Sequence, residues 1–200
     1  MHGCYRSRMT ESRRGASLIH ALAFQVTWFV CVSCAARGLP WVGVAACALF
    51  VAVSVGSSSA RWVELRYVAQ LTLLGAVCDS LSLTVSGALA WSSPSPWLGE
   101  WLAPPWVIGL WAAFVTLGPR ALSWLQDRLV LAAVLGAVAG PCSYLGAGRM
   151  GGAELTWPTW AVAGVVGLEY AAAMPVMMVL SRAVTRGQEA LVSDGSAPPA

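Results

Sequence analysis

Three polar side chains interrupt the long apolar stretches of this chain: Gln25, Asp79 and Glu169. An ionisable side chain near the centre of a bilayer costs about 2.5–3.5 kcal/mol on insertion scales, so it usually faces other helices and has a partner. Two carboxylates and an amide at similar depth predict a polar cavity that holds a cation, relays a proton or supplies an acid and a base. The alternative is that each group hydrogen-bonds a neighbouring helix and only fixes packing.

Further candidate residues lie at the end of the fifth apolar stretch and after it. Arg149 is one of only two arginines on the predicted outer side, which suggests a specific partner: Asp79, Glu154 or an anionic lipid headgroup. The alternative is an interfacial arginine with a buried stem and a solvated head. The segment 146–151 also matches the pattern G-x-G-x-x-G, but it follows an apolar helix and no strand, so we do not expect a dinucleotide site.

Proline at position 141 should bend the fifth helix, and carbonyl groups freed near Ser143 and Tyr144 would line a cavity or be satisfied by neighbouring helices. The candidate intramembrane polar site consists of Asp79, Glu169, Gln25, Arg149, Glu154 and Tyr144.

Other reactive side chains do not form a recognisable site. Cys31 and Cys34 make a C-x-x-C pair, but membrane thiol oxidoreductases need a second pair in an exposed loop, and the sequence has none. His2 and His20 are isolated, so no metal cluster is expected. We therefore expect no metal and no cofactor.

The composition identifies the environment that must position these residues. The chain is 58% hydrophobic and 10% charged, whereas soluble domains carry about 25% charged residues. Its net charge is only +3 and its arginines are not clustered into a patch, so we expect no nucleic-acid partner. The expected partner is a lipid bilayer.

Six apolar stretches predict an all-α, polytopic membrane bundle, since a helix needs about 20 residues to cross the hydrocarbon core. The fourth is the shortest, and a chain with five spans would put its ends on opposite sides. The stretches are 17–36, 40–57, 67–87, 104 to between 118 and 125, 129–147 and 158–182.

Arginine counts predict that both termini lie in the cytoplasm. Ten arginines fall on one side of the predicted spans and two, Arg37 and Arg149, on the other. Seven tryptophans, Trp97 among them, fall at the predicted outer boundary, and the segment 61–66 is expected to lie along the inner interface. The predicted domains are a cytoplasmic arm (1–16), a six-helix membrane domain (17–182) and a disordered cytoplasmic tail (183–200).

Several short motifs resemble one family of small bacterial inner-membrane proteins, catalogued as domain of unknown function 2878. The resemblance covers about residues 17–182 and implies a bacterial cytoplasmic membrane, with no activity to carry over. Glu169 is not part of the family pattern. The motifs are Phe24-Gln25-x-x-Trp28-Phe29-x-Cys31-Val32, Asp79-Ser80, Leu122-Ser-Trp124-Leu125, and Gly136-x-x-x-Gly140-Pro141-x-Ser143-Tyr144 followed by Leu145 to Arg149 and Glu154.

Three functional hypotheses remain open. The first is a membrane protein that handles a small solute, a proton or a lipid through a polar cavity around Asp79. The second is a lipid-modifying enzyme near the outer leaflet, for which Arg149 and Glu154 would be essential. The third is a scaffold without catalytic activity, in which single substitutions of Asp79, Glu169 or Arg149 change only stability.

Overall fold

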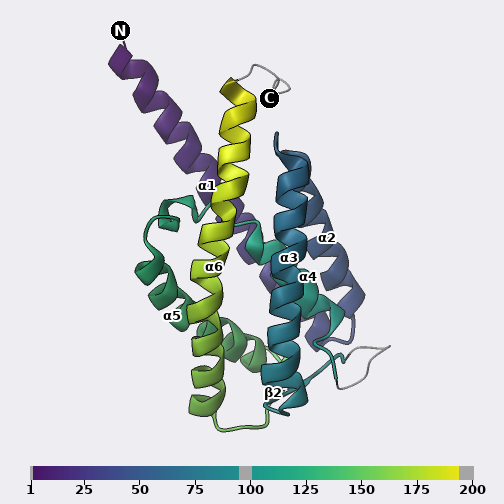
Figure 1. The fold of residues 1–200 in the computed structure, drawn as a ribbon. Coiled ribbons are helices and arrows are strands. Elements are labelled where there is room, and N and C mark those ends of the chain that lie inside the picture. Colours follow the sequence, from purple (N-terminus) through teal and green to yellow (C-terminus); the bar gives the residue numbers. More distant parts are fainter. Residues whose placement is uncertain (1, 95–100, 194–200) are drawn as a thin grey trace.

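The computed structural model describes residues 2–94 and 101–193, with side chains described for residues 15–94 and 101–191. Within these ranges the chain folds into six α-helices with short connections (Figure 1). The helices are α1 (His2–Ala36), α2 (Pro40–Gly56), α3 (Arg61–Asp79), α4 (Pro105–Val115), α5 (Leu129–Arg149) and α6 (Thr159–Ser193), and a π-helix, η1 (Ser80–Val85), extends α3.

Successive helices run in opposite directions, so α1 begins and α6 ends on the same side of the bundle (Figure 1). Four helical segments are long and apolar enough to cross a membrane, while α2 and α4 are shorter apolar helices. The prediction of an all-helical membrane protein is confirmed at this level. The four segments are Gly15–Ala36, Arg61–Val85, Leu129–Arg149 and Thr159–Leu191.

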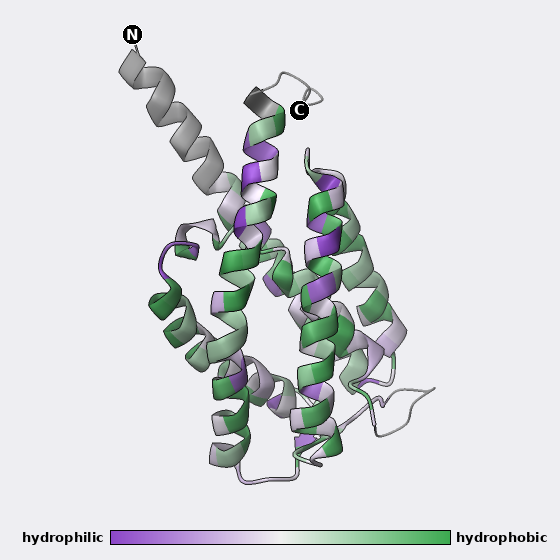
Figure 2. Cartoon of the chain, viewed as in Figure 1, coloured by the Kyte–Doolittle hydropathy of each residue, from purple (hydrophilic) through white to green (hydrophobic). Residues whose placement is uncertain are grey.

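Apolar side chains cover much of the outer surface of the bundle. Leu49, Leu73, Val130 and Leu168 are each at least two-thirds exposed. Hydrophilic residues concentrate at the end of the bundle where the termini lie, and apolar residues dominate the remainder (Figure 2). A soluble domain rarely exposes such contiguous apolar surface, whereas lipid solvates it without cost.

Helix α4 is a half-length helix followed by buried irregular chain. It ends at Val115, and residues 116–119 are buried although they are not helical. A short 3-10 turn, η2 (Ser123–Leu125), precedes α5. Irregular backbone at membrane depth is tolerated where protein buries it. The fourth helix therefore ends at Val115, before the range 118–125 in which we expected the fourth stretch to fade.

Two boundaries differ from those we expected. Helix α3 begins at Arg61, so residues 61–66 are its first turns and not a segment lying along the interface. Helix α6 continues to Ser193, so residues 183–193 are helical and the prediction of a disordered tail is wrong for them. Packing explains both, because Glu64 is fully buried and Gln188 donates to the Ser58 hydroxyl at 3.0 Å. Residues 194–200 and Trp97 lie outside the described residues.

A two-stranded antiparallel sheet closes the end of the bundle opposite the termini. Strand β1 (Leu89–Trp91) pairs with β2 (Ala153–Leu155), with Ala90 opposite Glu154. Sequence analysis did not predict these three-residue strands. Gly87 and Gly151 precede them with φ of 72° and 84°, a left-handed conformation that glycine adopts readily. The sheet joins the η1–α4 connection to the α5–α6 connection.

Candidate functional site

Asp79 lies where α3 changes from an α-helix to the π-helix η1. The π-helix is unusual and often marks functional sites in proteins. Its polar residues stabilise the irregular turn: the Ser80 hydroxyl donates to the Ala76 carbonyl and accepts from the Ala103 N–H at 3.0 Å, and the Thr84 hydroxyl donates to the Asp79 carbonyl at 3.3 Å. The Asp79 side chain is fully buried.

Two aromatic side chains donate hydrogen bonds to the same oxygen of Asp79. The Trp111 indole N–H of α4 donates to Oδ2 at 2.8 Å, and the Tyr144 hydroxyl of α5 donates to it at 2.5 Å. Both residues are buried. Asp79 therefore links three helices through neutral donors, and no cation contacts it among the described ion pairs.

Glycines make room for the aromatic rings at this site. A Cβ on Gly75, one turn before Asp79, would lie 2.1 Å from the Trp111 ring. A Cβ on Gly140 would lie 2.6 Å from the ring of Tyr170. The Tyr170 ring in turn packs 5.0 Å from Trp111 and 6.0 Å from Tyr144, measured between centroids. Gly75 of α3 and Gly140 of α5 thus allow close approach of the neighbouring helices, as small residues do in membrane bundles.

Glu169 on α6 completes the site. Its Oε2 accepts a hydrogen bond from the Ser82 hydroxyl at 2.8 Å, while its Oε1 is buried without a hydrogen-bonding partner. The Oδ1 of Asp79 also lacks a partner. The two carboxyl groups lie within hydrogen-bonding reach of each other. The site therefore contains two adjacent carboxyls, each with one oxygen that no protein donor satisfies.

The other predicted site residues lie elsewhere. Gln25 is exposed on the outer surface of α1, and Arg149 and Glu154 are exposed at the end of the bundle that carries the sheet. The structure therefore brings together Asp79, Glu169 and Tyr144, and leaves the other three apart. In the predicted C-x-x-C pair, Cys31 and Cys34 are both free thiols, and the Cys31 thiol contacts the Trp106 carbonyl.

Two hollows on the surface of the bundle do not open onto this site. One lies among Trp41, Pro94 and Pro105, and the other between α2, α3 and α4. The carboxyl pair is enclosed by packed side chains, with half-buried Glu169 as its most accessible member. In the part of the chain that is described, no group of three metal-binding side chains forms a metal site.

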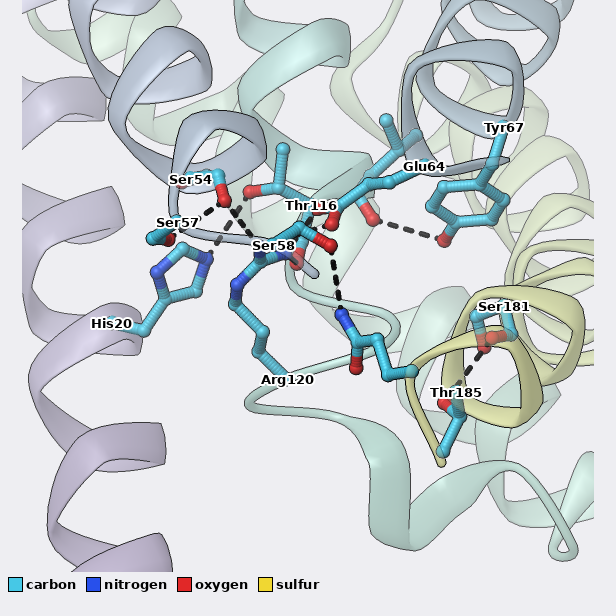
Figure 3. A network of polar contacts seen from close by, with 12 residues as sticks. His20, Ser54, Ser57, Ser58, Glu64, Tyr67, Thr116, Arg120, Ser181 and Thr185 are labelled. Atoms are coloured by element: carbon cyan, nitrogen blue, oxygen red, sulfur yellow. Dashed lines mark hydrogen bonds and ion pairs between the residues drawn. The ribbon is translucent and has the colours of Figure 1, made fainter. Parts of the chain in front are cut away.

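A second polar cluster, which was not expected from the sequence, surrounds Glu64 and Arg120 (Figure 3). It lies near the start of α3, toward the end of the bundle that carries the termini (Figure 1). Glu64 of α3 is fully buried and forms an ion pair with Arg120, whose second nitrogen contacts the other Glu64 oxygen at 3.1 Å. Arg120 also donates to the Ser54 carbonyl of α2. The irregular chain after α4 is what carries Arg120 into the bundle.

Hydrogen bonds extend this second cluster to α1, α4 and α6. His20 of α1 contacts the Thr116 hydroxyl at 3.2 Å, and the Tyr67 hydroxyl donates to the Val115 carbonyl at 2.9 Å. The Gln126 amide donates to Ser181 of α6 at 2.9 Å. The only signal in the sequence was a lone glutamate between Arg61 and Arg66, which also fits an exposed inner loop.

Comparisons with known proteins give a family and no closer relative. No curated protein matches the chain, and no solved structure matches it. The family model described as "Protein of unknown function (DUF2878)" matches residues 17–176. This region contains the Asp79–Glu169 pair and the Glu64–Arg120 pair, and it ends within α6. The earlier resemblance is thereby confirmed, and the chain belongs to the DUF2878 family.

Proposed function

We propose that this protein binds and exchanges a proton at the Asp79–Glu169 carboxyl pair, as part of a proton-linked membrane activity. One observation carries the proposal: fully buried Asp79 and half-buried Glu169 are adjacent, and each has one buried oxygen that no donor satisfies. A single proton held between them would satisfy both oxygens.

Electrostatics favours this occupant. Two ionised carboxylates in contact repel strongly where water is excluded, so such pairs tend to hold one proton between them. An unsatisfied buried polar atom costs about 1–3 kcal/mol, which a shared proton would avoid at both oxygens. Trp111 and Tyr144 direct their hydrogens at the remaining oxygen of Asp79 and would stabilise the charge that stays on the pair.

A proton fits this site better than a solute or a metal ion. A solute needs a pocket of about 300–1,000 Å³, and neither described hollow reaches Asp79. A metal ion needs several oxygen or nitrogen ligands with free lone pairs, whereas the Trp111 indole offers only a hydrogen. A proton needs no cavity, and Glu169 provides a half-buried entrance to the fully buried Asp79.

The proposed setting is the bacterial inner membrane, with six spans and both ends in the cytoplasm. The ten-to-two arginine distribution supports this orientation, and so does the position of both helical ends on one side of the bundle. Reporter fusions at residue 200 and in the 37–39 and 150–152 connections test it. Cytoplasmic activity of the terminal fusion and periplasmic activity of both loop fusions are expected; a periplasmic terminus would overturn the orientation.

Carbodiimide labelling tests the proton site directly, because carbodiimides modify protonated carboxyls in apolar surroundings. We expect intact-mass and peptide analysis to find the adduct on Glu169, with less labelling as the pH rises. Asp79→Asn should suppress labelling, because the amide donates a hydrogen bond to an ionised Glu169. Asp79→Leu should preserve it, since no donor then replaces the shared proton.

Two results would contradict the proposal. Labelling of Glu169 that is absent at every pH, or equal in Asp79→Asn and the wild type, would mean that the pair shares no proton. The scaffold hypothesis would then be favoured, because the carboxyls would serve packing alone. The lipid-modifying enzyme would instead require loss of activity on substituting exposed Arg149 or Glu154.

A further inference from the structure

An apolar groove runs along the outside of the bundle between α2, α3 and α4, on a face separate from the carboxyl pair. It is open along one side and has a volume of about 540 Å³. Val44, Ala48, Ala52 and Val55 of α2 form one wall. Leu65 of α3 and small residues of α4 form the rest.

The groove exists because its walls carry small side chains and because α4 is short. Gly109 and Ala112 of α4 leave room opposite Ala48 and Ala52 of α2. Between Pro40 and Gly56, α2 contains no charged residue, so the groove lies against hydrocarbon and not against water. From Val44 to Gly56 it follows α2 for about 18 Å, at 1.5 Å per residue.

The lining of the groove limits what can bind in it. Every residue that lines it is aliphatic, a glycine or Cys47, so the groove takes an apolar occupant. An extended hydrocarbon chain and an apolar helix of a second copy both meet this condition. A charge at one end of the groove favours the lipid.

A positive charge lies near one end of the groove. Arg61 is four residues before Leu65, so the two share a face of α3, with Arg61 one turn nearer the end of the bundle that carries the termini. Arg61 is exposed, and no described ion pair involves it. Its neighbour Trp62 is 68% exposed, as expected of a tryptophan at the headgroup level.

We propose that this groove binds an anionic glycerophospholipid, with one acyl chain between α2 and α4 and the phosphate on Arg61. The apolar walls supply contacts along the chain, and the guanidinium supplies charge complementarity at the headgroup. The site does not depend on the carboxyl pair, because none of its lining residues belongs to that pair.

Thermal unfolding of the detergent-purified protein with added phosphatidylglycerol tests the site. A bound ligand raises Tm in a saturable way, so phosphatidylglycerol should raise it more than phosphatidylcholine does. Ala48→Phe fills the groove and should abolish the difference between the Tm increases that the two lipids cause. Ala45→Phe places the same ring on an exposed part of α2 outside the groove, so the difference between the two Tm increases should remain.

The headgroup contact is tested with a matched pair of arginines. Arg61→Gln should weaken apparent phosphatidylglycerol binding about fivefold, as expected for one basic residue at an anionic lipid. Arg66→Gln should leave it unchanged, because five residues turn Arg66 about 140° around α3 from Arg61.

Four outcomes would overturn the proposal. The first is an equal Tm increase with both lipids, and the second is an equal loss in Ala45→Phe and Ala48→Phe. Inorganic phosphate that raises Tm as much as phosphatidylglycerol would show a free-anion site without the lipid chain. A dimer that Ala48→Phe converts to a monomer would assign the groove to a second copy.

Discussion

Two fully buried carboxylates on the same helix have opposite surroundings. Glu64 is paired with Arg120, which contacts both of its oxygens. Asp79 accepts hydrogen bonds from neutral donors on one oxygen, has no donor on the other, and lies close to the carboxyl group of Glu169. A buried charge with a complete set of partners fixes structure, whereas an incomplete set leaves a place for something to bind. The different surroundings therefore favour a structural role for the Glu64 cluster and support the role in proton binding that we propose for Asp79.

Breaking the Glu64–Arg120 ion pair should cause the largest loss of stability. Arg120→Ala leaves Glu64 buried without a counter-charge, which costs about 3–5 kcal/mol in other proteins. Denaturant titration in mixed micelles measures the free energy of unfolding. The double variant Glu64→Leu/Arg120→Leu should recover most of the loss, and Arg128→Ala, at an exposed arginine, should cost little. A stable Arg120→Ala protein would show that Glu64 does not depend on the pair.

Crowding the Trp111 ring should cause the second largest loss of stability. Gly75→Ala puts a methyl group 2.1 Å from that ring, and overpacking of this kind costs about 1–3 kcal/mol. Because displacement of the ring also removes a donor from Asp79, Glu169 labelling by carbodiimide should change in the same variant. Gly164→Ala is the matched control, since nothing lies within 4 Å of its added Cβ. Equal stability of the two variants would remove the proposed role of Gly75.

Asp79→Asn should change stability by less than about 1 kcal/mol, because the amide oxygen still accepts from Trp111 and Tyr144. The same denaturant titration compares the free energies of unfolding of Asp79→Asn and Glu64→Gln. Glu64→Gln should lose more stability, because it leaves Arg120 without a counter-charge. If Asp79→Asn proved the more damaging of the two, the distinction between the clusters would be lost.

The smallest effect is expected for Gln25→Ala. Gln25 is exposed on α1, and surface substitutions usually stay within about 0.5 kcal/mol. Stability and Glu169 labelling should both match the wild type. A changed labelling profile would return Gln25 to the site from which the structure separates it.

The sequence contained most of the helical layout, because long apolar runs have few alternatives to membrane helices. It also pointed to Asp79 and Glu169, since a carboxyl inside such a run needs a partner. It could not orient Gln25, because residues 17–36 of α1 are apolar on nearly every side. No periodic stripe distinguishes the buried face of this helix, which contains Cys31, Val32 and Ala35.

The Glu64–Arg120 pair was hidden for a different reason. Both residues lie beside the apolar runs, where charged side chains normally face water. Burial of this pair depends on the irregular chain after α4 turning back into the bundle, which is a tertiary feature with no local signature. The same holds for the sheet that joins β1 and β2, since three-residue strands give no period to detect.

Infrared difference spectroscopy of the purified protein tests the shared proton most directly. The stretching band of a protonated carboxyl separates from that of a carboxylate and shifts when hydrogen is exchanged for deuterium. The account predicts such a band in the wild-type protein, its loss in Asp79→Asn and its persistence in Glu64→Gln. A wild-type spectrum without the band, or a band that Asp79→Asn leaves unchanged, would contradict the proton site.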